Sequence, residues 1–169
     1  MRNGAKIIWL LIAATLILSG ISYAQGPATP TKKDKCPVCG MFVATYPNWV
    51  AQVVFKDGTH VFFDGPKDMF KFVFNVKKYD NTRSAADIAG MYVAEYYSTK
   101  PVNAKDVFFI TGSDVMGPMG KELVPVKGKA NAETFMKDHK GKKMLRFDEV
   151  TMKDIPMRMK MKGMKMKGM

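Results

Sequence analysis

The feature that most constrains the fold is a repeated order of short apolar segments with strand-like or helix-like spacing. In the first half of the chain, Trp49 to Lys56 and Thr59 to Phe63 predict two strands, and Asp57-Gly58 between them is typical of a two-residue hairpin turn. Apolar residues then recur at helical spacing from Asp64, a candidate N-cap, to about Lys78. Met91 to Ser98 predicts a third strand. This half therefore predicts the order strand, strand, helix, strand.

The second half of the chain repeats that order. Val107 to Thr111 and Leu123 to Val126 predict strands, Asn131 to Lys140 predicts a helix that ends at Gly141, and Met144 to Val150 predicts a closing strand. Two successive strand-strand-helix-strand units indicate an internal duplication and an α+β fold, with helices packed on mainly antiparallel sheet.

The N-terminus has the three parts of a secretory signal. Two positive charges precede an apolar run from Ile7 to Leu18, and Ser22-Tyr23-Ala24 offers small residues where a signal peptidase cleaves. The run is shorter than the roughly 20 residues of a membrane-spanning helix. We therefore expect residues 1–24 to be a cleaved signal peptide and the mature protein to be periplasmic or otherwise secreted.

The remaining chain divides by composition. Residues 25–35 are polar and Pro-containing and predict a flexible linker, and residues 36–151 form the predicted domain. Residues 152–169 alternate methionine with lysine or glycine, which predicts a disordered tail. The formal net charge is +12, and this basic tail is a candidate for weak contact with a membrane surface. An exported chain without a nucleic-acid-binding motif is not expected to bind nucleic acid.

The two cysteines, Cys36 and Cys39, form a Cys-x-x-Cys motif that allows several interpretations. In an oxidising compartment the ordinary interpretation is a disulfide, structural or redox-active. A zinc site needs further ligands, and the two histidines, His60 and His139, are far apart in the sequence, so zinc is disfavoured. A thioredoxin-type pair opens a helix, whereas this pair follows a polar stretch and no helical pattern comes after it.

Methionine favours a copper interpretation of the same motif. The chain contains 15 methionines, and Met41 lies two residues beyond Cys39. Met116 and Met119 lie together in a segment rich in Gly and Pro. Such a segment is expected to be a loop, and a methionine there is less easily explained as a buried core residue than a methionine on a helix. Thiolate and thioether sulfurs are soft donors that select Cu(I). We expect metal ligands among Cys36, Cys39, Met41, Met116 and Met119.

Four segments resemble the NosL family, the accessory copper chaperones of nitrous-oxide reductase. They are CPVCGM at Cys36 to Met41, the hairpin at Asp57-Gly58, FFDG at Phe62 to Gly65, and GSDVMGPMGKELVP at Gly112 to Pro125. The resemblance runs from Cys36 to about Val150. It implies a fold of two strand-strand-helix-strand units, similar to one domain of organomercurial lyase.

The resemblance also implies a function and a site. It implies a periplasmic Cu(I)-binding protein that serves denitrification, with Cys39, Met41 and Met116 as the nearest donors and Cys36 as an alternative or resolving thiol. Lys121 stands where many relatives are expected to have His. Members are often lipoproteins, but residues 1–35 contain no cysteine, so we expect a soluble protein.

Three functions are compatible with these residues. The preferred one is a Cu(I) chaperone that delivers copper by ligand exchange to a cuproenzyme, expected to be nitrous-oxide reductase with its accessory proteins. The alternatives are a thiol-disulfide oxidoreductase that uses Cys36 and Cys39, and a copper-sequestering resistance protein. No catalytic acid–base pair or nucleophilic triad stands out, so we expect no enzyme activity. The acids near the motifs, including Asp64 and Asp68, have ordinary explanations as turn or cap residues.

Overall fold

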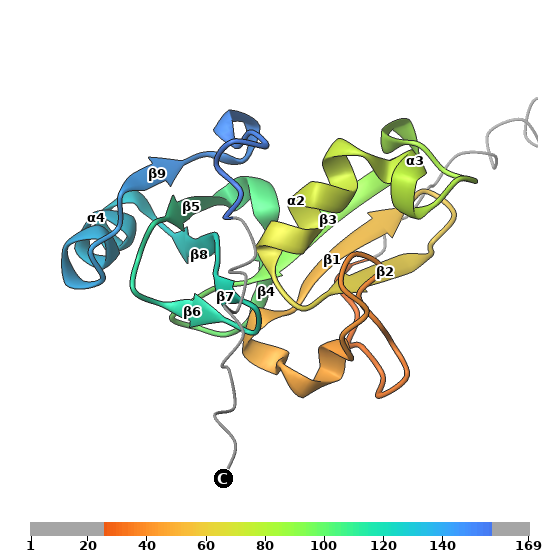
Figure 1. The fold of residues 1–169 in the computed structure, drawn as a ribbon, viewed down its shortest axis with the longest axis horizontal. Helices are drawn as coiled ribbons and strands as arrows, with labels where there is room; N and C mark the ends of the chain where they lie inside the picture. Colours follow the sequence, from red (N-terminus) through yellow and green to blue (C-terminus); the bar gives the residue numbers. More distant parts are fainter. Residues whose placement is uncertain (1–25, 157–169) are drawn as a thin grey trace, which may run out of the picture.

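The computed structural model describes residues 26–156 and shows two α/β units side by side (Figure 1). The predicted signal peptide and most of the methionine-rich tail lie outside the described residues. Within the described part, no helix is long and apolar enough to cross a membrane.

The first unit is a four-stranded antiparallel sheet with two helices. Its strands have the order β2-β1-β3-β4. All five residues of the central strand β1 are buried, as expected for a strand with a neighbour on each side and covered faces. The elements are β1 (Ala51–Phe55), β2 (His60–Phe63), α2 (Pro66–Phe74), α3 (Val76–Tyr79), β3 (Ile88–Ala94) and β4 (Pro101–Asn103).

The second unit has the same arrangement in a smaller sheet. Its strands have the order β8-β5-β9, again with the first strand of the unit at the centre and antiparallel neighbours on both sides. A short hairpin, β6–β7, is inserted between β5 and β8. The elements are β5 (Val107–Thr111), β6 (Met116–Gly117), β7 (Gly120–Lys121), β8 (Val124–Lys127), α4 (Lys129–Asp138) and β9 (Lys143–Leu145).

The predicted α+β fold of two strand-strand-helix-strand units is therefore confirmed. Each unit places its helix after its second strand and returns its third strand to the free edge of its first, which is the arrangement expected of a duplication. Strands β4, β6 and β7 were not expected from the sequence, because they are only two or three residues long and show no clear alternation.

The predicted first helix differs from the observed one at both ends. It was expected to continue to Lys78, but it breaks at Asn75, where the backbone leaves helical geometry. Its N-cap is Gly65, and Asp64 makes no cap hydrogen bond. Instead, the carboxylate of Glu122, from the second unit, accepts a hydrogen bond from the backbone N–H of Lys67 (2.6 Å). A Cβ atom at residue 65 would collide with the end of the Glu122 side chain, so glycine leaves room for this close approach.

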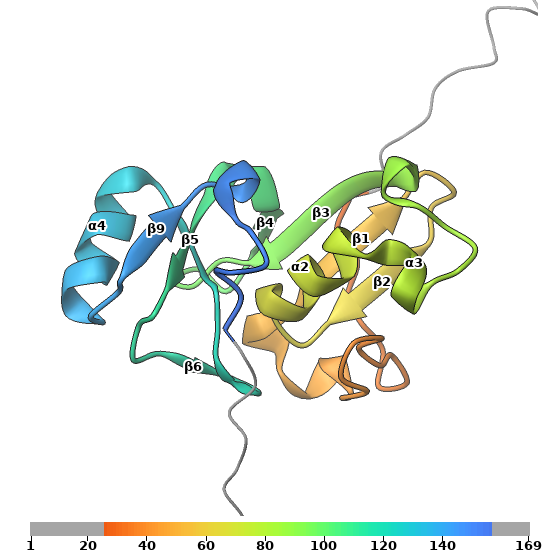
Figure 2. The same cartoon turned by 45° about the horizontal axis from the view of Figure 1, so that its top comes forward.

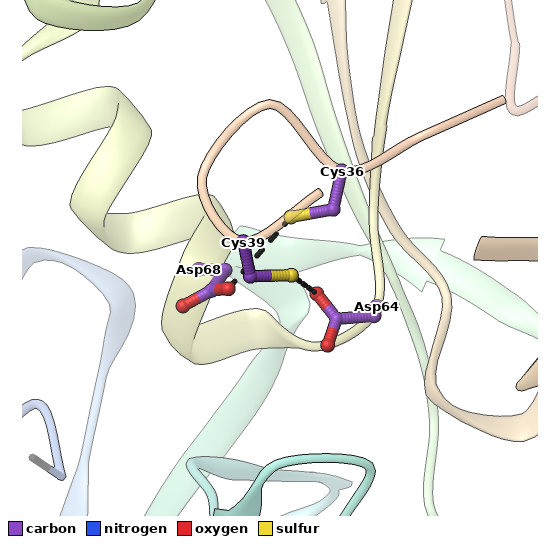
Figure 3. A group of neighbouring side chains, drawn as sticks. All are labelled: Cys36, Cys39, Asp64 and Asp68. Carbon is purple, nitrogen blue, oxygen red and sulfur yellow. Dashed lines mark hydrogen bonds between the residues drawn. The ribbon is translucent and has the colours of Figure 1, made fainter. Parts of the chain in front are cut away.

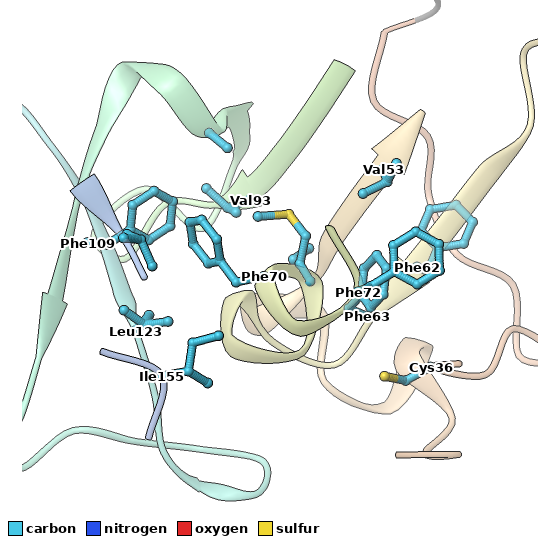
Figure 4. Close-up of a cluster of buried hydrophobic side chains, with 14 of the residues drawn as sticks. Cys36, Val53, Phe62, Phe63, Phe70, Phe72, Val93, Phe109, Leu123 and Ile155 are labelled. Carbon is cyan, nitrogen blue, oxygen red and sulfur yellow. The ribbon is translucent and has the colours of Figure 1, made fainter. Parts of the chain in front are cut away.

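Helix α2 joins the two units through aromatic residues on opposite sides (Figure 4). Phe72 packs on the first sheet, with its ring centroid 5.2 Å from that of Phe63. Phe70 points toward the second unit, with its centroid 4.9 Å from that of Phe109 in β5. The main core cluster accordingly contains residues from both sheets. A second cluster lies between α4 and the second sheet, at the far end of the molecule (Figures 1 and 2).

Both ends of the described chain make specific contacts with the domain. In the segment predicted to be a linker, the backbone N–H and C=O of Ala28 both bond to the side chain of Gln52. In the segment predicted to begin the tail, Asp154 binds Lys143 (2.7 Å) and Ile155 is buried in the main core. The ordered contacts therefore extend beyond residues 36–151 in both directions.

The central position of α2 gives a first prediction. Replacing Phe70 by alanine should lower the free energy of unfolding by about 3–5 kcal/mol, because it opens a cavity between the two units. Phe74→Ala, on the same helix at a side chain 41% exposed, is the matched control and should cost about 1 kcal/mol or less. Urea unfolding followed by circular dichroism measures both values, and equal losses would contradict the interior role of Phe70.

Candidate metal centre

The Cys-x-x-Cys motif lies in a tight loop closed by backbone hydrogen bonds. The N–H of Cys36 donates to the carbonyl of Met41 (2.9 Å), and the N–H of Gly40 donates to the carbonyl of Cys36 (2.8 Å). Gly40 has a φ of +81°, a conformation that glycine adopts at little cost. The chain reverses so tightly that Cys36 and Cys39 present their sulfurs to the same side of the loop (Figure 3).

Two aspartates meet these sulfurs from the junction between β2 and α2. Asp64 follows the last residue of β2, and Asp68 lies in the first turn of α2. The Cys39 thiol donates to Asp64 Oδ1 (3.1 Å), and the Cys36 thiol makes a longer contact with Asp68 Oδ2 (3.7 Å). One ligand atom from each of the four residues lies within 4.8 Å of all the others. The junction thus forms one compact cluster with the cysteine loop (Figure 3).

The cluster is closed to solvent except at Cys39. Cys36, Asp64 and Asp68 are buried, with 1–2% of their surface exposed, whereas Cys39 is half-buried. Lys71, one turn further along α2, forms an ion pair with Asp68 (2.7 Å). Among the four residues, Cys39 is therefore the one that solvent reaches most easily.

Burial determines the charge state of both thiols. Removal from water raises the pKa of the Cys36 thiol to about 12, and backbone hydrogen bonding to Cys39 opposes this only in part. The pKa of the Cys39 thiol is also raised well above its usual range, first by burial and then by its hydrogen bond to Asp64. Both cysteines are free. They are protonated at neutral pH and act as hydrogen-bond donors to the carboxylates.

The methionine-bearing hairpin β6–β7 is attached to the same helix by a buried lysine. Lys67 Nζ donates to the carbonyls of Met119 (3.3 Å) and Lys121 (3.0 Å) and forms an ion pair with Glu122 (3.6 Å). Burial raises the pKa of the Glu122 carboxyl to about 7, against the opposing effect of Lys67. Lys67 precedes Asp68, so this ion pair holds the hairpin at the end of α2 that carries the cluster.

The structure brings two of the five predicted metal ligands together in one cluster and places the other three on neighbouring segments. Cys36 and Cys39 lie in one cluster. Met41 is half-buried in the cysteine loop, Met119 is half-buried in the β6–β7 turn, and the Met116 side chain is 48% exposed. The three methionines lie on the two segments that meet the N-terminal end of α2, and their coordination of metal remains a prediction.

The chain can now be compared with known proteins. The family model of NosL matches residues 27–155. The chain belongs to the NosL family. Among solved structures, the crystal structure of the copper chaperone NosL from Shewanella denitrificans matches with a TM-score of 0.64 and 25% sequence identity, covering 77% of this chain and 98% of that chain. No curated protein gives a significant match.

Within this NosL domain, sequence reasoning missed the two aspartates. Asp64 and Asp68 were given turn and cap roles, but neither caps α2, and both contact a cysteine. A signal was present, because Asp64 directly follows the buried Phe62-Phe63 pair, and a buried carboxylate needs a polar partner. The histidines behave as expected for structural residues: His60 bonds to Gln52 and His139 to Asp114, and neither belongs to the cluster.

The raised pKa values predict slow thiol chemistry in this NosL protein. At about pH 7 the folded, reduced protein should react with iodoacetamide far more slowly than the protein denatured in urea, because few thiolates are present. The rate should still be rising at about pH 10, since the thiol pKa values lie above the ordinary value of about 8.5. Peptide mass spectrometry resolves Cys36 from Cys39. A plateau of either rate near pH 8 would contradict this electrostatic account.

Proposed function

We propose that this NosL protein is a periplasmic Cu(I) chaperone that holds copper through Cys36, Cys39, Met41, Met116 and Met119 and passes it on by ligand exchange. The observation that carries the proposal is the pair of convergent, unbridged thiols beside a hairpin with an exposed thioether. Soft sulfur donors of these two kinds select Cu(I) among the common biological metals. The family and the NosL copper chaperone from Shewanella denitrificans support the same role.

The unequal exposure of the ligands suits stepwise transfer. Met116 is the most exposed of the proposed donors, Cys39 is half-buried and Cys36 is buried. Copper would therefore enter through Met116 and Cys39 and reach Cys36 last, and it would leave in the reverse order. A recipient protein can bind the copper ion through its own ligand at the exposed side before the Cys36 sulfur dissociates from it. The copper ion is therefore never free in solution. Because thiolates are the strong ligands, loading releases protons from the cysteines.

The oxidoreductase alternative is disfavoured by the electrostatics of the pair. Thiol-disulfide enzymes depend on a cysteine with a lowered pKa, usually at a helix N-terminus. Here burial raises the pKa of both thiols, and the loop is followed by two short 3-10 turns, Val43–Thr45 and Pro47–Trp49, instead of an α-helix. A buried, protonated pair of cysteines is a poor nucleophile and suits metal capture better.

Substitution of a proposed ligand distinguishes Cu(I) binding from thiol-disulfide exchange, because only Cu(I) binding uses the methionines. Cys39→Ser and Met116→Leu should each weaken Cu(I) binding at least about tenfold in competition with a chromophoric Cu(I) chelator, because each removes a soft donor. Met152→Leu, at another exposed methionine (60%, against 48% for Met116) outside the proposed site, is the matched control and should bind like the unchanged protein. If the unchanged, reduced protein cannot compete with a moderate chelator, the Cu(I) proposal is wrong.

Delivery to a recipient distinguishes a chaperone from a copper sink. We propose nitrous-oxide reductase as that recipient, on the basis of the family resemblance, and export through the N-terminal signal. In a denitrifying host that lacks its own NosL, expression of this chain should raise the copper content of purified nitrous-oxide reductase. The Cys39→Ser variant should not do so. A gain in copper tolerance without any gain in reductase copper would favour sequestration, and recovery of the chain in the cytoplasmic fraction would contradict export.

A further inference from the structure

One exposed aromatic side chain stands next to the proposed copper site. Phe42 directly follows Met41, and half of its surface is open to solvent. We propose that this ring and three neighbouring lysines form a docking face for the copper recipient, and that the recipient presents an acidic surface with an apolar side chain at its centre. The lysines are Lys32, Lys33 and Lys35, and the four residues together are called the Phe42 face. The inference rests on the proposed function, because docking serves transfer only if the protein carries copper.

The stem of the cysteine loop holds the Phe42 ring in place. Phe42 forms an isolated antiparallel β-bridge with Lys35. This bridge lies directly outside the hydrogen bond from the N–H of Cys36 to the carbonyl of Met41 that closes the loop. The Lys35 ammonium group lies 4.8 Å from the centroid of the Phe42 ring, and cation–π attraction favours this position. A ring that is already held in this way loses little conformational freedom when a partner binds.

The other two lysines of the face lie in a turn that an aspartate closes. The backbone N–H of Asp34 donates to the carbonyl of Thr31 (3.1 Å), and the Asp34 carboxylate accepts from the N–H and the hydroxyl of Thr31 (2.6 and 2.8 Å). All three lysines of the face are exposed, and none forms an ion pair with another described residue. The Phe42 face therefore offers positive charge to a partner.

A surface hollow beside the ring can accept an apolar side chain. The hollow has a volume of about 350 Å³ and is lined by Lys32, Phe42, Ala44 and Thr45. Phe42 and Ala44 supply its apolar lining, and Lys32 supplies a positive charge. A single exposed aromatic residue is common on protein surfaces, but an aromatic ring beside a hollow is also the usual anchor of an interface, with charges around it that steer the encounter. A matching partner places an apolar side chain in the hollow and carboxylates opposite the lysines.

The position of the face favours a protein over a lipid surface as the partner. Cys39 is the cluster residue that solvent reaches most easily, and it lies on the loop whose stem carries Phe42. The cysteine loop and the β6–β7 hairpin both lie on the lower side of the molecule in Figures 1 and 2. A partner bound at Phe42 therefore comes close to the proposed copper donors, and a lipid has no soft ligand with which to accept copper. A second copy of this chain would present the same positive charges, which repel one another.

Copper transfer from the full mature chain, loaded with Cu(I), to copper-free nitrous-oxide reductase tests the inference. Phe42→Ala should slow the transfer at least about tenfold at recipient concentrations below saturation, and Phe42→Leu should keep most of the rate because it keeps an apolar anchor. A triple variant, with Lys32, Lys33 and Lys35 changed to Gln, should slow the transfer about tenfold at low salt and weaken its dependence on ionic strength. Cu(I) affinity in chelator competition should stay within about threefold in all three variants, because no proposed copper ligand is changed.

Matched controls come from surfaces away from the Phe42 face. Phe74→Ala removes another exposed aromatic side chain (41%), which lies on α2. A second triple variant removes the same number of charges from exposed lysines in and directly after α4, at the far end of the molecule from the cysteine loop (Figure 1). It changes Lys129, Lys137 and Lys140 to Gln. Both controls should change the transfer rate less than about twofold, which separates a local docking face from an effect of net charge.

The possible results distinguish this inference from the proposed function. If Phe42→Ala and the face triple variant transfer copper at the unchanged rate, the inference is overturned and the proposed function stands. The inference is also overturned if these variants lose binding to vesicles that contain phosphatidylglycerol but transfer copper normally, because the face then binds lipid. A reduced protein that cannot compete for Cu(I), or that delivers none to the reductase, would refute the proposed function and this inference with it.

Discussion

The structure depends on how the first turn of α2 is held between the two units. Glu122 from the second unit accepts the backbone N–H of Lys67, and the Lys67 ammonium group binds Glu122 and two carbonyls of the β6–β7 region. Both side chains are buried, so neither can lose its partner without leaving an unsatisfied charge in the interior. This ion pair fixes the helix end, the hairpin and the junction that carries Asp64 and Asp68 relative to one another.

Asp64 is released from its ordinary local role by that arrangement. An aspartate before a helix usually caps it, but here the cap group comes from the other unit. The Asp64 carboxylate is therefore available to meet Cys39, and Asp68 meets Cys36 from the same helix turn. Burial beside these carboxylates raises the pKa of both thiols, so they stay protonated at neutral pH. Under the proposed function, a bound metal ion would replace these protons.

Much of the fold was predictable because its signals are local. Hydrophobic periodicity gave the order of strands and helices, and β5 was predicted with its observed bounds. Errors occurred where a distant segment decides the outcome. The cap of the first helix and the contacts of Ala28 and Ile155 involve residues far away in the chain. No pattern within a short window contains that information.

The sequence by itself determined the sulfur-rich chemistry, since Cys36, Cys39 and the methionine segments are visible as soft donors and resemble those of NosL proteins. It also determined the duplicated unit, because strand and helix periods are properties of neighbouring residues. Only the tertiary structure decided which hard donors join the thiols and how deeply each thiol is buried. The reason is that burial and convergence are properties of packing. The loop at residue 36 and the helix at residue 68 lie 32 positions apart in the sequence and become neighbours only when the chain folds.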